Sequence, residues 1–134
     1  MKKFIGIVML CGLLVTIPLY SFTQNLALNK TVATSSVQSS SFAGKYAVDG
    51  STSTRWSSAA SDPQWIYVDL GNQYNITSVK ITWASAYGRN YTIDISNNAT
   101  SWTTIKSVNN NTSLTNTNTV SGTGRYVRMY GTRR

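Results

Sequence analysis

The sequence predicts an all-β fold, either a sandwich or a barrel, and three observations support this prediction. First, apolar and polar residues alternate along short segments, as they do in strands with one buried face. Second, these segments recur at intervals of roughly 8–12 residues and are bounded by turn residues. Third, the chain shows no apolar periodicity of the helical kind. The expected strands span residues 65–71, 78–83, 91–96, 102–108, 117–122 and 125–131.

The segment 91–96 shows the alternation well. Tyr91, Ile93 and Ile95 share one face, and Asp94 lies on the opposite face, because successive side chains of a strand point to opposite sides. We therefore expect the three apolar side chains to enter the core and Asp94 to face outward. The tryptophans all lie in or beside predicted strands, and we expect them to pack the sandwich rather than bind a ligand: Trp56, Trp65, Trp83 and Trp102.

The N-terminal region has the pattern of a secretory signal peptide. Lys2 and Lys3 precede a mostly apolar run over residues 4–20, and small residues follow it. The apolar core is short and asymmetrically flanked, which favours a cleaved signal peptide over the alternative, an uncleaved anchor helix. We therefore expect a signal peptide over residues 1–23, a mature domain over residues 24–134, and a secreted or cell-surface product without membrane insertion after cleavage.

The chain is basic and offers few groups for acid–base catalysis. Its 12 Lys and Arg residues outnumber 4 acidic residues, so the net charge is +8, or +6 without Lys2 and Lys3. The basic residues are scattered, whereas nucleic-acid-binding proteins more often cluster them on one face. Histidine and glutamate are absent, and the only acids are Asp49, Asp62, Asp69 and Asp94. This composition argues against a hydrolase, and we predict no catalytic residue and no nucleic-acid partner.

The stretch AVDGSTSTRW, residues 47–56, combines an Asp-Gly pair with four hydroxyl residues. Calcium prefers carboxylate, carbonyl and hydroxyl oxygens, and glycine allows the backbone to turn so that such groups converge. An Asx-type turn without metal accounts for the same residues. The local sequence leaves both interpretations open and favours the turn.

The order of motifs along the chain resembles one family. NLALNKTVATSS (25–36), AVDGSTSTRW (47–56), QWIYVDLG (64–71), ITSVKITWASAYGRNYTIDIS (76–96) and GTGRYVRMYGT (122–132) resemble the discoidin, or coagulation factor 5/8 type C, domain. Within it they are most similar to bacterial galactose-binding-like modules of carbohydrate-binding family 32. The resemblance implies a jelly-roll β-sandwich with a structural calcium ion. The ligands it implies are the carbonyls of Tyr46 and Ser51, the Asp49 side chain and Thr54.

One departure from the family concerns the C-terminal end. Family members supply a glutamate from a final strand to the same calcium ion, but this sequence contains no glutamate and stops at YGTRR. We therefore expect the last strand to be missing, the sequence to be a fragment, and calcium affinity to be weakened.

The connection WASAYGRNY, residues 83–91, is the candidate ligand site. An aromatic face packs on a sugar ring, while arginine and asparagine bind hydroxyl groups with fixed donors. Related modules use this connection for polar contacts, so the resemblance implies Arg89 and Asn90 as ligand residues and Tyr87 as the stacking platform. Relatives often carry an acid where Ala84 stands, so one contact is expected to be absent.

These observations together favour a non-catalytic, secreted carbohydrate-binding module that targets glycans. Such modules are often appended to a glycan-degrading enzyme, so we expect a catalytic domain in a longer parent protein. The alternative is a cell-surface adhesion or protein-interaction domain, because the same fold binds proteins and phospholipid surfaces in animal relatives. The loop tips are mostly Ser, Ala, Asn and Gly, which argues against binding to membranes.

Overall fold

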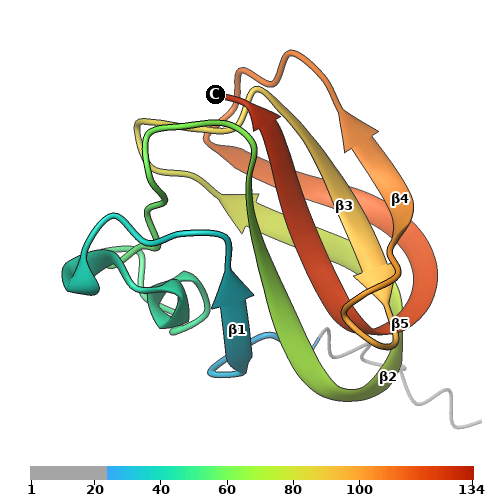
Figure 1. The fold of residues 1–134 in the computed structure, drawn as a ribbon. Helices are drawn as coiled ribbons and strands as arrows, with labels where there is room; N and C mark the ends of the chain where they lie inside the picture. The colour runs from blue at the N-terminus through green and yellow to red at the C-terminus, as the bar shows by residue number, and fades with distance from the viewer. Residues whose placement is uncertain (1–23) are drawn as a thin grey trace, which may run out of the picture.

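The computed structural model describes residues 24–134, so the predicted signal peptide lies outside the described residues. Five strands and two short 3-10 helices make up the fold (Figure 1). They are β1 (Thr31–Thr34), η1 (Ser40–Phe42), η2 (Gly44–Ala47), β2 (Gln64–Thr82), β3 (Asn90–Ser96), β4 (Thr103–Val108) and β5 (Thr115–Arg133). Within residues 24–134 there is no helix with the length and apolarity needed to cross a membrane.

All strand pairs are antiparallel, and the order in the sheet is β1-β2-β5-β3-β4. Strands β2 and β5 have 19 residues each and remain paired along most of their length. Their register shifts between Asp69 and Tyr74 and again between Ile76 and Ser78. Figure 1 shows both strands curving there. The C-terminal part of β2 and the N-terminal part of β5 therefore lie behind the rest of the sheet and form a second layer. The result is a β-sandwich, as the sequence predicts.

The predicted strand boundaries are wrong at these two bends. The segments 65–71 and 78–83 belong to the single strand β2, and 117–122 and 125–131 belong to β5. The turn-forming residues between them do not end the strands, because both partners bend together through bulges. Strand β1 was not among the expected strands, and at four residues it is too short to show a clear alternation.

The core lies between the two layers. Its buried members are Leu70, Ile76, Tyr91, Ile93 and Val120. Ile93 has no exposed surface, and Tyr91 is 2% exposed. The predicted inward face of the segment 91–96 is therefore confirmed.

Asp94 lies on the outer face of β3, as expected, yet it is only 2% exposed. The guanidinium of Arg128 on β5 covers it, with an Nη2–Oδ2 distance of 2.9 Å. The Thr104 hydroxyl on β4 donates to Oδ1 at 2.7 Å. This interaction joins three adjacent strands, because Asp94 pairs in register with both Arg128 and Thr104.

Candidate functional site

The predicted ligand connection lies where several loops meet at one end of the sandwich. Residues 57–63, 83–89 and 109–114 and the C-terminal residues lie together at this end (Figure 1). Backbone hydrogen bonds join the last three of these segments, since Arg89 N donates to Arg133 O at 2.8 Å and Asn111 N donates to Arg89 O at 2.8 Å. The Asp62–Arg134 ion pair, at 3.2 Å, joins the first segment to the C-terminal residues. We call this region the loop end.

Trp83 fixes the start of the connection. Its ring packs on Tyr91 with a centroid distance of 5.3 Å, and its Nε1 donates to Asn116 Oδ1 at 2.7 Å. Gly88 lies directly against this ring, and a Cβ atom at Gly88 would approach Trp83 Cη2 to 2.8 Å. Only glycine therefore fits at position 88 without displacing the tryptophan. The expectation that Trp83 packs the sandwich is confirmed.

Asparagine side chains tie the connection to the loop 109–114. The Asn111 amide donates to the carbonyls of Gly88 and Ser113, both at 3.0 Å, and accepts from Asn116 Nδ2 at 3.0 Å. Asn111 is 6% exposed, so these bonds are shielded from water and hold both loops in one arrangement. We call this set the asparagine network. The sequence indicated only a long polar connection here, and its richness in asparagine was the available clue.

The three predicted ligand residues have different environments. Tyr87 is half-buried at the loop end. Asn90 begins β3, and its Oδ1 accepts a hydrogen bond from Asn110 N at 3.0 Å, so this oxygen has a structural role. Arg89 is half-buried, and its Nε is a buried donor with no hydrogen-bond partner among the described residues. No ion pair within residues 24–134 engages the Arg89 guanidinium, so its outer Nη donors make Arg89 the candidate for contact with a ligand.

The predicted metal loop forms a compact turn around Asp49. Its Oδ1 accepts from Ser51 N at 2.9 Å, and its Oδ2 accepts from the Thr54 hydroxyl at 2.7 Å. The Thr54 hydrogen bond, followed by that from Ser51, lowers the pKa of Asp49 below its ordinary value. Gly50 has a φ of 78°, which a glycine adopts without strain. This geometry is that of an Asx-type turn, and it also keeps the carboxylate ionised.

Calcium is a hard cation that prefers oxygen ligands, and this turn supplies carboxylate, hydroxyl and carbonyl oxygens. The four residues named by the resemblance lie close in sequence, and Asp49 and Thr54 are in direct contact. Tyr46 lies within the short helix η2, and Ser51 follows Gly50. Asp49 is the single carboxylate, and no cluster of three or more His, Cys, Asp or Glu side chains occurs within residues 24–134. The donor set therefore fits a weak site completed by carbonyls and water.

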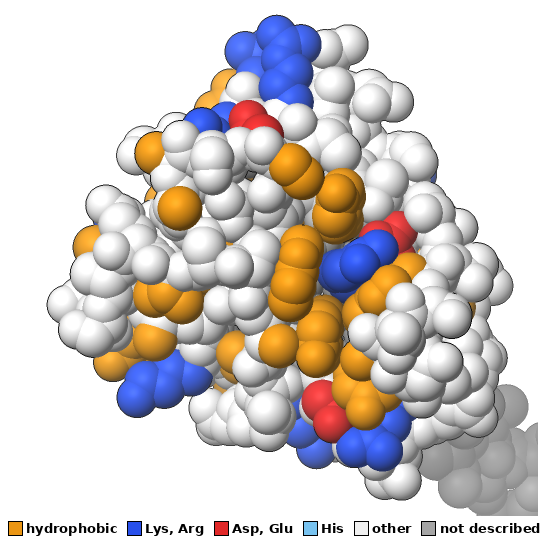
Figure 2. Space-filling view, viewed as in Figure 1, with side chains coloured by type: hydrophobic (Ala, Val, Ile, Leu, Met, Phe, Trp, Pro, Cys, Tyr) orange, Lys and Arg blue, Asp and Glu red, His pale blue; other side chains and the backbone are white. Residues whose placement is uncertain are grey.

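Aromatic side chains cover the outer face of the main sheet. Figure 2 shows hydrophobic side chains gathered in a band over the middle of this face. Trp65 and Tyr67 stack at 5.6 Å, while Trp102 and Tyr126 contact Tyr67 from its other sides. Arg128 lies over Trp102 at 4.2 Å from the ring centroid. Trp65 stacks on Tyr67, and Trp102 contacts both Tyr67 and Arg128, so both tryptophans pack on the outer face of the sheet.

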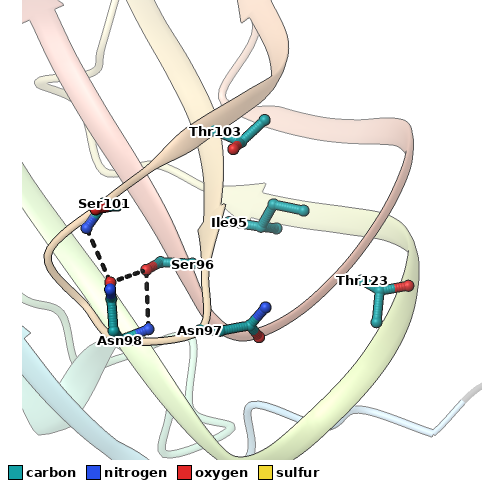
Figure 3. Close-up of a pocket in the computed structure, with 7 residues that line it drawn as sticks. All are labelled: Ile95, Ser96, Asn97, Asn98, Ser101, Thr103 and Thr123. Atoms are coloured by element: carbon teal, nitrogen blue, oxygen red, sulfur yellow. Dashed lines mark hydrogen bonds between the residues drawn. The ribbon is translucent and has the colours of Figure 1, made fainter.

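A shallow hollow of about 230 Å³ lies at the opposite end of the molecule. Figure 3 shows its polar lining, which comes from the turn between β3 and β4 and from the bend in β5. Asn98 Oδ1 accepts from Thr100 N and Ser101 N, both at 2.9 Å, and the Ser96 hydroxyl accepts from Ala99 N at 3.0 Å. These hydrogen bonds stabilise the turn itself, so Ser96 and Asn98 have a structural role in the hollow.

A β-sandwich whose irregular polar loops gather at one end of a rigid scaffold has the architecture of a binding module. The chain belongs to the family described as NedA-like, galactose-binding domain (F5/F8 type C), whose model matches residues 46–129. This match confirms the resemblance to the factor 5/8 type C domain.

Known proteins support the same assignment. Chitosan-binding module 2 of a chitosanase/glucanase from Paenibacillus sp. IK-5, solved with chitotriose, is 41% identical over 82% of this chain and 88% of that chain, with a TM-score of 0.80. The family 32 carbohydrate-binding module of AlyQ, solved with 4,5-unsaturated mannuronic acid, is 26% identical over 76% of this chain and 81% of that chain, with a TM-score of 0.67. The galactose-binding-like sandwich predicted from the sequence is confirmed by these structures.

A curated relative matches over a short segment only. The polysaccharide lyase 8 family protein HylA of Enterococcus faecalis is 54% identical over 35 residues, which are 26% of this chain. The match spans 3% of the length of that relative.

Proposed function

We propose that this chain is a non-catalytic, secreted glycan-binding module that brings a glycan-degrading enzyme to its substrate. The observation that carries the proposal is the 41% identity to a chitosan-binding module solved with chitotriose. The chemistry of the chain agrees, because it lacks histidine and glutamate and its aspartates serve structural hydrogen bonds and ion pairs. Secretion is supported by the N-terminal sequence pattern.

In this proposal the loop end binds the sugar. Tyr87 packs its ring against the apolar side of a sugar unit, and Arg89 and Asn90 donate hydrogen bonds to its oxygens. The asparagine network holds the loops in place before the ligand arrives, which reduces the entropy lost on binding. Affinity for one short glycan is expected to be weak, on the order of 0.1–1 mM, so attachment to an enzyme or multiple copies increases the effective affinity.

Replacing Tyr87 by alanine tests the stacking platform. We expect the purified protein to bind oligosaccharides in a glycan panel and the variant to lose about tenfold in affinity, because an aromatic contact is worth about 0.5–1.5 kcal/mol beyond its buried area. Isothermal titration with the best panel ligand measures the loss. The matched control is Tyr126→Ala, a tyrosine of the aromatic band outside the loop end, which should leave the affinity unchanged. Unchanged affinity in the Tyr87 variant would refute the platform, and no binding to any glycan would favour the adhesion alternative.

We also propose that the Asp49 turn binds calcium weakly. At a calcium concentration about ten times the dissociation constant, binding should raise the free energy of unfolding by about 1.4 kcal/mol. Urea unfolding with calcium, with magnesium at the same concentration, and with a chelator measures this difference. Asp49→Asn should abolish the calcium response, whereas Asp62→Asn, which removes a carboxylate elsewhere, should retain it. A calcium response that survives in Asp49→Asn would place the ion elsewhere.

A further inference from the structure

The carboxylates of the described residues are all engaged within the protein. Three form ion pairs, namely Asp69 with Arg125, Asp94 with Arg128 and Asp62 with Arg134. The fourth, Asp49, accepts hydrogen bonds from Ser51 and Thr54. A protonated amino sugar is bound most strongly by a free carboxylate, because charge-assisted hydrogen bonds are about twice as strong as neutral ones. Residues 24–134 offer no such carboxylate at the loop end.

The loop end carries positive charge instead. Arg89 and Arg133 are adjacent, since Arg89 N donates to Arg133 O at 2.8 Å, and neither guanidinium forms an ion pair within residues 24–134. The buried Nε of Arg89 has no acceptor there. Because this Nε is buried, a ligand does not reach it, and the outer Nη donors of these two arginines are the groups that suit a carboxylate or sulfate oxygen.

We propose that the loop end selects a glycan whose sugars carry an oxyanion, a carboxylate or a sulfate, over one whose sugars carry a protonated amine. The inference rests on the proposed glycan-binding function and names its ligand class. Arg89 binds the oxyanion directly, and Arg133 adds a second, exposed charge beside it. The net charge of +6 in the mature domain favours the approach of such a polyanion.

Matched trisaccharides of different charge test this selection. Trimannuronate, a sulfated galactose trisaccharide, neutral triacetylchitotriose and cationic chitotriose are titrated into the purified protein. We expect one of the anionic ligands to bind at least about tenfold more tightly than chitotriose, and the tighter anionic ligand identifies the oxyanion. This advantage should shrink when the salt concentration rises from about 0.05 M to about 0.5 M, because screening weakens exposed ion pairs.

Two variants locate the charge that makes the difference. Arg89→Gln should weaken binding of the anionic ligand about tenfold and that of triacetylchitotriose by only about threefold, because the neutral sugar loses an ordinary hydrogen bond and the oxyanion loses a charge-assisted one. Lys30→Gln removes an exposed cation just before β1, beside the bend of β2 and away from the loop end, and is the control for net charge. If Arg89→Gln unfolds more easily, Arg133→Gln, at an exposed position, should still reduce the anionic preference.

The outcomes separate this inference from the function on which it rests. The charge selection would be overturned if chitotriose bound as tightly as the anionic ligands or more tightly. It would also be overturned if both arginine variants kept the anionic preference. Either result would still be consistent with a glycan-binding module. An equal loss in Lys30→Gln would also overturn the charge selection, because the preference would then reflect net charge alone. Failure of all four trisaccharides to bind would instead overturn the glycan-binding function itself.

Discussion

Replacing Arg128 by leucine is expected to destabilise the fold by about 3–5 kcal/mol, because it leaves a buried carboxylate without its partner. Asp94 is 2% exposed, and the Arg128 side chain is 19% exposed. Leucine retains part of the apolar contact that Arg128 makes with Trp102, so the loss reflects the ion pair. Urea unfolding followed by tryptophan fluorescence measures the change in free energy.

Two further variants separate the ion pair from other effects. Arg125→Leu breaks an ion pair whose arginine side chain is 43% exposed, and it should lower stability by at most about 1 kcal/mol. The double variant Asp94→Asn, Arg128→Leu removes the unpaired charge but keeps an acceptor for Thr104, so it should recover at least about 1 kcal/mol relative to Arg128→Leu. Equal losses in the Arg125 and Arg128 variants would show that burial of Asp94 is not the cause.

Replacing Ile93 by alanine should lower the free energy of unfolding by about 2–5 kcal/mol. Ile93 has no exposed surface and lies in the core cluster between the two layers. Truncation leaves a cavity that the paired strands β4 and β5 on either side of β3 cannot collapse to fill. A small domain has about 5–15 kcal/mol of stability in total, so this loss is a large fraction of it.

The control for this variant is Val37→Ala, an apolar truncation at a side chain that is 42% exposed. It should change stability by no more than about 0.5 kcal/mol. Both variants are compared by urea unfolding under the same conditions. If Ile93→Ala lowered the free energy of unfolding no more than Val37→Ala, Ile93 would not be packed in the core as described.

The sequence was sufficient to predict the core face of β3 and most strand segments other than β1, because a half-buried strand imposes an alternation of period two. Tyr91 and Ile93 follow that alternation and are buried. The continuity of β2 through residues 72–77 was not predictable, because it depends on pairing with β5 more than 40 residues away. Local turn propensity favours a break there, and tertiary pairing overrides it.

The burial of Asp94 and its pairing with Arg128 could not be predicted from the sequence either. Alternation places it correctly on the outer face, but only the register of β3 with β5 sets Arg128 beside it. At the loop end the sequence offered Tyr87, Arg89 and Asn90, which lie on one connection. It could not show that Asn111 would bind the carbonyl of Gly88, since such long-range side-chain bonds leave no periodic pattern. The role of Tyr87, Arg89 and Asn90 in ligand binding remains a prediction.

The asparagine network also bears on how new specificity could be built into this scaffold. Residues 83–90 and 109–116 share buried hydrogen bonds, so neither segment keeps its shape when the other is exchanged. Grafting a foreign sequence into the first segment alone would remove the Trp83 donor from Asn116 and disturb the Gly88 carbonyl that Asn111 binds. The two segments should therefore be exchanged together. A library can vary the tips of both segments and still preserve the scaffold if it retains Trp83, Gly88, Asn111 and Asn116.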